Sequence, residues 1–365
     1  MRIKSLEIFS FRLPLIQPIV IKGIPMPARS GLLIRMASDA GAAGWGDIAP
    51  LPGFSSERLE DARAQLFRLR PSIQNTELPD SWSPLVDNLP ILPNTREWSS
   101  SVRFGIELAL WNLCPVIGRT KGPGNPNAEH CRKVFINGLL TGRKDEIVTQ
   151  ARELSGSGYR AVKLKVGGKS VDEDIRLTLK VREAIGRSVG LRLDANGAWT
   201  LEEALKFSKG VEQSEIDYIE EPLRDLYKLT AFSLDSGLPV ALDETLRDHP
   251  IEKLVNIKTL KAIVIKPTLL GGFHRSNQLA LKARELGLQP VVSSAFETGI
   301  GIAGLARWAA VVAGGVPVGL DTYRWLAEDV LLSGIDVSNG AVDLPLLEKK
   351  KKDINFSLLE ELKDG

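Results

Sequence analysis

Two lysines separated by one residue lie at the end of a short apolar run and could carry out acid–base chemistry. The run is Arg160-Ala-Val-Lys163-Leu-Lys165-Val-Gly167. In an extended strand alternate side chains share a face, so Lys163 and Lys165 would lie side by side on an apolar backing. Two stacked ammonium groups predict a lysine pKa below its ordinary value of about 10.4, which makes a usable base near neutral pH. Such pairs also lie on the solvent face of edge strands, so the pair alone does not define a site.

Several later apolar runs also end in groups that could bind or react. These groups are Asp194 with Asn196, Glu220, Asp243, Lys266 and the pair Ser293 and Ser294. From Lys165 to Ser294 the successive steps are 29, 26, 23, 23 and 28 residues, which fits a strand, a loop, a helix and a second loop for each step. In a parallel strand–helix barrel all strands end at one mouth. We therefore expect an α/β fold in which the carboxylates and lysines share one pocket.

Three of these groups are carboxylates from consecutive strand ends and could be oxygen ligands of one cation. Carboxylate ligation without His or Cys favours a hard ion, and Mg²⁺ is the predicted metal. If a substrate carboxylate bound that ion, loss of its α-proton would give an enediolate whose charge the metal and an ammonium group stabilise. Lys165 and Lys266 would approach the carbon from opposite faces.

The first third of the chain has a different pattern. Alternating apolar residues at 9–15 and 32–36 predict a small antiparallel sheet. Helical spacing of apolar residues follows at 59–69 and 102–113. A sheet followed by helices, without alternation of the two, predicts that residues 1–125 form a separate α+β capping domain.

A stretch rich in Gly, Pro and Asn at 119–127 predicts the boundary after this domain. The barrel is predicted at 132–324, with a first strand at 134–138 and a last strand at 316–321. Segment 325–365 lacks the strand–helix rhythm, and we expect it to pack back on the capping domain.

Local signals add detail to these elements. Ser170 with Glu173 and Thr200 with Glu203 each predict a capping box at the start of a crossover helix. Segment 48–56, with two prolines and a glycine, is predicted to be a mobile lid.

Composition excludes several classes of protein. The 365 residues carry a formal net charge of +2, with 43% hydrophobic and 25% charged residues, as in ordinary soluble globular proteins. A nearly balanced charge gives no support for nucleic-acid binding.

Cys114 and Cys131 match neither a disulfide framework nor a metal-ligand spacing. There is no apolar core of a signal peptide and no run near the ~18 apolar residues of a membrane span. We expect a cytoplasmic protein without nucleic-acid or membrane partners.

The ordered motifs resemble those of the enolase superfamily, muconate-lactonizing subgroup, over nearly the whole chain. They are Lys163-x-Lys165, Asp194-x-Asn196, Glu220-Glu221-Pro222, Asp243-Glu244-Thr245 and Lys266-Pro267. The resemblance implies a (β/α)7β TIM-like barrel with an α+β N-terminal capping domain that the C-terminal segment completes. It implies that Asp194, Glu220 and Asp243 hold Mg²⁺. It also implies Lys165 as the acid/base, Lys163 as its modulator and Lys266 as the lysine opposite.

Two absences narrow the choice within the superfamily. The mandelate-racemase type would need a histidine at the seventh strand end, but 291–295 reads Val-Val-Ser-Ser-Ala. Dipeptide epimerases carry Asp-x-Asp at the eighth strand end, where 321–323 reads Asp-Thr-Tyr. Motifs such as those at 49–55 and 293–297 resemble instead the o-succinylbenzoate synthase family of menaquinone or phylloquinone synthesis, which dehydrates 2-succinyl-6-hydroxy-2,4-cyclohexadiene-1-carboxylate.

For that reaction the resemblance implies a role for each of two lysines. Lys165 removes the ring α-proton and, once protonated, assists departure of the hydroxyl group. Lys266 stays charged and steadies the ring through a cation–π contact. The candidate contacts of the small-molecule carboxylate substrate are Asn196, Ser293, Ser294 and Gly299. Near residue 299 a helix N-terminus could offer amides to an anion.

Other interpretations stay open. The same lysines could racemise an N-succinylamino acid, one removing the α-proton and the other returning it. A non-enzymatic barrel scaffold is disfavoured because all five metal and lysine positions are filled. Gly299-x-Gly301-x-x-Gly304 matches a dinucleotide fingerprint but lies late in the repeating array, so no NAD or FAD is predicted. The sequence does not distinguish a monomer from a homo-oligomer.

Overall fold

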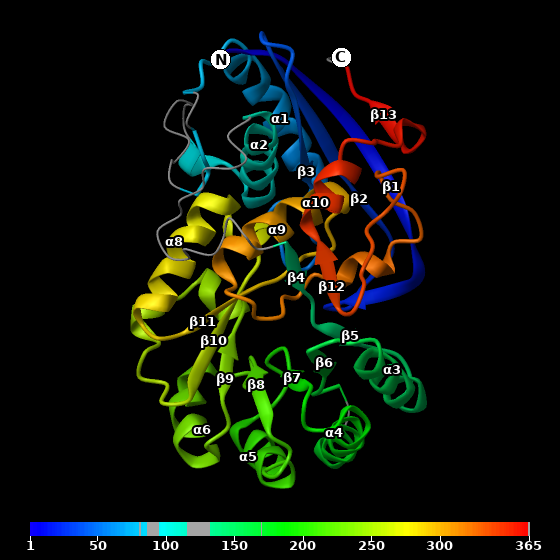
Figure 1. Ribbon diagram of the computed structural model, residues 1–365. Helices are drawn as coiled ribbons and strands as arrows, with labels where there is room; N and C mark the ends of the chain where they lie inside the picture. The colour runs from blue at the N-terminus through cyan, green and yellow to red at the C-terminus, as the bar shows by residue number, and fades with distance from the viewer. Residues whose placement is uncertain (80–81, 86–94, 115–131, 169, 364–365) are drawn as a thin grey trace.

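The computed structural model describes residues 1–79, 82–85, 95–114, 132–168 and 170–363 (Figure 1). The boundary predicted at 119–127 and Cys131 lie outside these ranges. Within them, no helix combines the length and the apolar character that crossing a bilayer requires.

The strands are β1 Ile3–Ile21, β2 Ile24–Ser38, β3 Ala43–Ile48, β4 Lys133–Phe135, β5 Gly138–Leu140, β6 Ala161–Lys165, β7 Gly190–Asp194, β8 Ile216–Glu220, β9 Val240–Leu242, β10 Leu260–Ile265, β11 Gln289–Val292, β12 Ala341–Asp343 and β13 Leu359–Glu361. The α-helices are α1 Leu59–Ile73, α2 Ser100–Leu113, α3 Lys144–Gly156, α4 Val171–Ile185, α5 Leu201–Gly210, α6 Leu229–Ser236, α7 Pro267–Leu270, α8 Gly272–Glu285, α9 Gly299–Val312 and α10 Leu344–Lys350. The 3-10 helices are η1 Thr95–Glu97, η3 Leu226–Lys228, η4 Glu244–Arg247, η5 Ile251–Lys253, η6 Asp321–Trp325 and η7 Phe356–Leu358.

A four-stranded antiparallel sheet in the order β13-β1-β2-β3 forms one end of the molecule (Figure 1). Its first three strands come from the start of the chain, and the last strand of the chain pairs with β1, with Phe9 opposite Glu361. Helix α2 packs very closely on β3. A Cβ atom on Gly46 would lie 1.9 Å from the carbonyl oxygen of Gly105, so this contact requires glycine.

A seven-stranded sheet in the order β11-β10-β9-β8-β7-β6-β5 forms the other part. All of its neighbouring strands run parallel. Helices such as α3 to α6 cover its outer side (Figure 1), and β10 accordingly reads as a continuous buried apolar run at 262–265. This curled parallel sheet beside an antiparallel N-terminal sheet confirms the α/β class.

Both ends of the parallel sheet differ from the predicted strands. Segment 134–138 was expected to be one strand, but β4 pairs with β12 and only Gly138 belongs to the sheet strand β5. The pairing partner of β4 lies about two hundred residues later in the chain, so local sequence does not reveal it. Segment 316–321 makes isolated parallel bridges, Ile136 with Val318 and Ser293 with Gly319, instead of a continuous strand.

One of the two predicted capping boxes forms completely. At α5 the Thr200 hydroxyl accepts from the Glu203 amide and the Glu203 carboxylate accepts from the Thr200 amide. At α4 Ser170 caps the amide of Glu173, but the Glu173 carboxylate accepts instead from the Lys144 ammonium group at 2.5 Å. A stronger charge-assisted bond therefore replaces the reciprocal half of the box.

Candidate functional site

The candidate side chains lie at the carboxyl ends of neighbouring parallel strands. The pairing of β6 with β7 puts Lys165 opposite Asp194, and the pairing of β7 with β8 puts Asp194 opposite Glu220. Asp243 directly follows β9 and Lys266 directly follows β10. The strand order thus brings to one edge of the sheet residues that are a hundred positions apart.

Lys163 joins two of the carboxylates. Its ammonium group lies 2.8 Å from Oδ2 of Asp194 and 2.8 Å from both carboxylate oxygens of Glu220. Burial works to lower the pKa of Lys163, but Asp194 and Glu220 outweigh it and raise the pKa well above its usual range. Carboxylates from two other strands, rather than a second ammonium group, therefore dominate the surroundings of Lys163.

Lys266 forms the second ion pair of the site, with Asp243. Burial again opposes the charge on this lysine, but Asp243 and Glu220 raise its pKa well above the ordinary value. The ammonium group also lies 5.7 Å from the ring centroid of Phe54, within cation–π range. Phe54 belongs to the loop between β3 and α1, so the N-terminal domain reaches the strand ends.

The carboxylates share a strongly charged environment. Burial works to raise the pKa of Asp194, but the ammonium groups of Lys163, Lys165 and Lys266 lower it below the ordinary value. Burial and the neighbouring Asp194 raise the pKa of Glu220 well above its usual range, although Lys163 opposes the shift. All three predicted lysines thus act electrostatically on one carboxylate.

Lys165 differs from the other two lysines. Its side chain is exposed, whereas those of Lys163 and Lys266 are only 13% and 15% exposed. Within the described residues it makes neither a hydrogen bond nor an ion pair. Of the three lysines at these strand ends, Lys165 is thus the one that does not hold a carboxylate.

The donor set suits a hard divalent cation, although the three carboxylates do not form a finished ligand shell. Among the residues that the structure describes, no three His, Cys, Asp or Glu side chains are grouped as a metal site. Ammonium groups contact the predicted ligands instead. Glu244, which follows Asp243 in the chain, has a further buried oxygen, Oε2, that finds no hydrogen-bond partner among the described residues. Closely spaced carboxylates with an unsatisfied oxygen are chemically suited to Mg²⁺, so the ligand assignment stays a prediction.

Glu244 is one of the residues that sequence reasoning did not single out as functional. Its Oε1 accepts a hydrogen bond from Nδ2 of Asn196 at 3.3 Å, which ties the ends of β7 and β9 together. Glu221 has a positioning role, because its carboxylate accepts from the amides of Asp243 and Thr245 at 2.7 and 2.9 Å. In the Glu-Glu-Pro and Asp-Glu-Thr motifs, each of these two acids directly follows a predicted metal ligand. That neighbouring position is the sequence signal from which their roles could have been predicted.

The candidate substrate contacts have different surroundings. Asn196 is exposed at the strand ends. The Ser294 hydroxyl donates to the carbonyl of Gly319 at 2.9 Å, and Ser293 contacts the same oxygen at 3.3 Å. The amide of Gly299 donates to Oδ1 of Asp329 at 2.9 Å.

The contact with Asp329 corrects the expectation for Gly299. An internal carboxylate already caps the N-terminus of α9, so this amide is not open to a substrate anion. The glycines of the fingerprint serve packing, since a Cβ on Gly304 would lie 2.4 Å from Leu108.

Arg29 was also missed by the sequence interpretation. From β2 its buried guanidinium group donates to the carbonyl oxygens of Ala49 and Pro50, and at 2.9 Å to that of Phe296. It therefore fixes the base of the loop that carries Phe54 against the loop after β11. Its partners are up to 267 residues away in sequence, so no local motif marks it.

Comparisons with known proteins agree with this geometry. Residues 146–347 match the family described as Enolase C-terminal domain-like, and residues 3–113 match the family described as MenC, N-terminal domain. The o-succinylbenzoate synthase of Vibrio cholerae serotype O1 is 33% identical over 327 residues, which are 86% of this chain and 88% of that protein.

Solved structures share the fold. The L-Ala-D/L-Glu epimerase from Bacillus subtilis has a TM-score of 0.78 and 23% identity, over 94% of this chain and 97% of that chain. The dipeptide epimerase from Enterococcus faecalis V583, complexed with Mg and L-Leu-L-Tyr, has a TM-score of 0.78 and 21% identity over the same shares of the two chains, 94% and 97%. At these identities the likeness concerns the fold alone.

Proposed function

The chain belongs to the o-succinylbenzoate synthase family of the enolase superfamily, and from that premise we propose how its own residues carry out the reaction. The enzyme is a carbon–oxygen lyase that dehydrates 2-succinyl-6-hydroxy-2,4-cyclohexadiene-1-carboxylate. The observation that carries the assignment of roles is the difference among the lysines. Lys163 and Lys266 hold carboxylates, whereas Lys165 is exposed and holds none among the described residues.

Lys165 is the acid and base in this proposal. Its neutral amine takes the proton from the ring carbon that bears the carboxylate. The electron pair of that C–H bond forms the new ring double bond as the C–O bond to the hydroxyl group breaks. The ammonium group of Lys165 returns the proton to the departing oxygen, which leaves as water, and the lysine is neutral again. A single lysine can perform both transfers because both groups lie on adjacent ring carbons.

Lys266 supplies fixed positive charge. The carboxylates around it favour its charged form, and in this proposal it stays protonated throughout the reaction. Its ammonium group lies within cation–π distance of the Phe54 ring. In this proposal the ammonium group makes the same kind of contact with the substrate ring. Phe54, held on the loop that Arg29 anchors, excludes water from that side.

Asp194, Glu220 and Asp243 are the residues that we propose as ligands of Mg²⁺. A bound divalent cation would supply positive charge where the substrate carboxylate becomes more negative during proton removal. The E. faecalis relative in fold is a complex with Mg, which supports this choice of ion. Before the ion binds, Lys163, in contact with two of the three carboxylates, keeps them close together.

Racemisation of N-succinylamino acids, the rival reaction, requires two lysines that exchange protons. The matches to the MenC N-terminal family and to o-succinylbenzoate synthases favour dehydration as the main activity. Hydrogen–deuterium exchange at the α-carbon of an N-succinylamino acid measures the rival reaction directly.

We also infer that the parallel sheet closes into a TIM-like barrel. The amide of Asn137, the residue before β5, donates to the carbonyl of Val318 at 2.9 Å, and the amide of Gly319 donates to that of Val292 in β11 at 2.8 Å. One segment thus contacts β11 at one edge of the sheet and the residue next to β5 at the other. Pro317 has no amide hydrogen, which limits this segment to short bridges. The division into 1–125, 132–324 and 325–365 and a cytoplasmic location stay part of the proposal.

The test is a matched pair of lysine variants. Lys165→Ala should lower kcat by about 10²–10⁴, the usual contribution of a general acid–base group, when formation of the aromatic product is followed by absorbance. Lys206→Ala removes a lysine that is 56% exposed and pairs only with Asp172 on the surface, and it should keep full activity. Wild-type turnover by Lys165→Ala would refute the proposed role. A chelator should abolish wild-type turnover, and added Mg²⁺ should restore it.

A further inference from the structure

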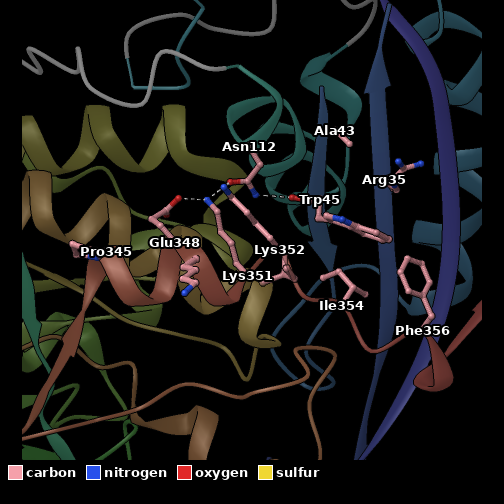
Figure 2. A pocket seen from close by; sticks show the side chains of 12 residues that line it. Arg35, Ala43, Trp45, Asn112, Pro345, Glu348, Lys351, Lys352, Ile354 and Phe356 are labelled. Atoms are coloured by element: carbon pink, nitrogen blue, oxygen red, sulfur yellow. Dashed lines mark hydrogen bonds and ion pairs between the residues drawn. The ribbon is translucent and has the colours of Figure 1, made fainter. Parts of the chain in front are cut away.

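A second pocket lies apart from the strand ends, between the antiparallel sheet and α10 (Figure 2). Its volume is about 630 Å³, within the range of sites for small molecules. None of the residues proposed for catalysis or metal binding lines it. The lining combines basic and aromatic side chains, and the reaction proposed above uses none of them.

Positive charge is in excess at this pocket. Lys349, Lys351 and Lys352 line it, and Glu348 is the one acidic residue among its lining residues in the described structure. The Lys351 ammonium group lies 2.5 Å from Glu348 and donates to Oδ1 of Asn112 at 2.9 Å. The Lys351 side chain is only 11% exposed, so little water solvates its charge.

A second buried cation, Arg307 of α9, acts on the same groups. Its three guanidinium nitrogens are buried, and none has a hydrogen-bond partner within the described residues. The guanidinium carbon lies 3.5 Å from the ring centroid of Trp111. Burial and the charge of Arg307 lower the pKa of Lys351 to about 8. Glu348 contacts Lys351 directly and acts on Arg307 only electrostatically, so positive charge stays in excess and a further anion beside Lys351 would be stabilising.

The opposite side of the pocket is apolar and aromatic. Figure 2 shows Trp45, Ile354 and Phe356 on one side and Glu348 and Lys351 on the other. The rings of Trp45 and Phe356 meet edge to face with centroids 5.8 Å apart. Phe356 is 57% exposed, so part of this aromatic surface is left to solvent.

We propose that this pocket binds a small aromatic carboxylate, with its ring against Trp45 and Phe356 and its carboxylate at Lys351. The ring extends the edge-to-face packing that the two aromatic side chains already make. The carboxylate receives a charge-assisted hydrogen bond from the ammonium group and adds negative charge to a pocket that Lys349 and Lys352 also line. A purely inorganic anion would leave the aromatic side unused, and a neutral aromatic molecule would leave the charge unbalanced.

The experiment must locate the ligand, because the product of the proposed reaction is also an aromatic carboxylate. Crystals of the full-length protein soaked in 4-bromobenzoate allow the bromine to be placed by anomalous diffraction. Bromine beside Trp45 and Phe356 is the expected result. Bromine only at the strand ends, or at neither place at the solubility limit, would overturn the proposal.

Titration calorimetry with 4-bromobenzoate tests the two recognition elements separately. Lys351→Met should weaken binding at this pocket at least about tenfold, which corresponds to about 1.4 kcal/mol, and Phe356→Ala should weaken it several-fold. Lys206→Met, which removes an exposed charge elsewhere, should leave it unchanged. The proposal would be contradicted if the wild type and the three variants bound 4-bromobenzoate with equal affinity. It would also be contradicted if inorganic phosphate bound as tightly as 4-bromobenzoate.

Discussion

Replacing Lys163 with methionine removes the ammonium group that joins Asp194 to Glu220. Each contact is 2.8 Å long, and the side chains are only 13%, 6% and 1% exposed. At an effective dielectric constant of about 20, a pair of charges at this distance attracts by about 6 kcal/mol before the cost of desolvation. Loss of one partner of a buried ion pair has a net cost of about 3–5 kcal/mol, because the remaining charges stay buried. We expect Lys163→Met to lose that much stability without divalent ions.

Equilibrium unfolding in urea, with and without Mg²⁺, measures the effect. Mg²⁺ should stabilise Lys163→Met more than the wild type, because in the wild type the ammonium group competes for the same oxygens. Lys206→Met is the matched control. Its pair with Asp172 is also 2.8 Å long but is 56% and 55% exposed, so its loss should cost no more than about 1 kcal/mol. Equal losses in the two variants would refute the reasoning, as would a loss in Lys163→Met that Mg²⁺ does not reduce.

Three further changes test other parts of the structure, each by chemical denaturation. Burial raises the pKa of Asp47 from 3.8 to about 7, so the stability that its protonated form contributes at low pH is lost as pH rises through that range. Asp47→Asn should therefore be more stable than the wild type at about pH 8 but not at about pH 4, and a difference independent of pH would contradict this. Gly46→Ala should lose at least about 1–3 kcal/mol by overpacking against α2, whereas Gly156→Ala, with nothing within 4 Å of the added Cβ, should gain up to about 1 kcal/mol. Thr200→Ala should lose about 1 kcal/mol with the cap of α5, and no loss would show that solvent replaces the cap equally well.

The sequence predicted best those features of the site that depend on the order of neighbouring residues along the chain. Short, mainly apolar runs that each end in a polar group predict strand ends, and a regular interval predicts that those ends face the same way. Lys165, Asp194 and Glu220 therefore lie on adjacent strands as expected. Membership of the superfamily was also accessible, because it depends on the order of motifs rather than on their contacts.

Contacts between distant segments were not predictable in the same way. The interpretation of Lys163 and Lys165 considered only repulsion within one strand, whereas the carboxylates that determine the charge of Lys163 come from two other strands. The use of the Gly299 amide depends on Asp329, and the pairing of β4 depends on residues 341–343. In each case the deciding partner is a side chain or strand whose position only the folded chain defines.

The anchoring of residues 49 and 50 by Arg29 has a consequence for how a ligand enters and leaves. Both carbonyls at the root of the loop are held, and the same guanidinium group is bonded to the far side of the mouth at Phe296. We therefore expect the part beyond Pro50, which carries Phe54, to move more than this root when a ligand enters or leaves. In hydrogen exchange, the amides between Leu51 and Ser55 should then exchange with solvent sooner than the amide of Ala49.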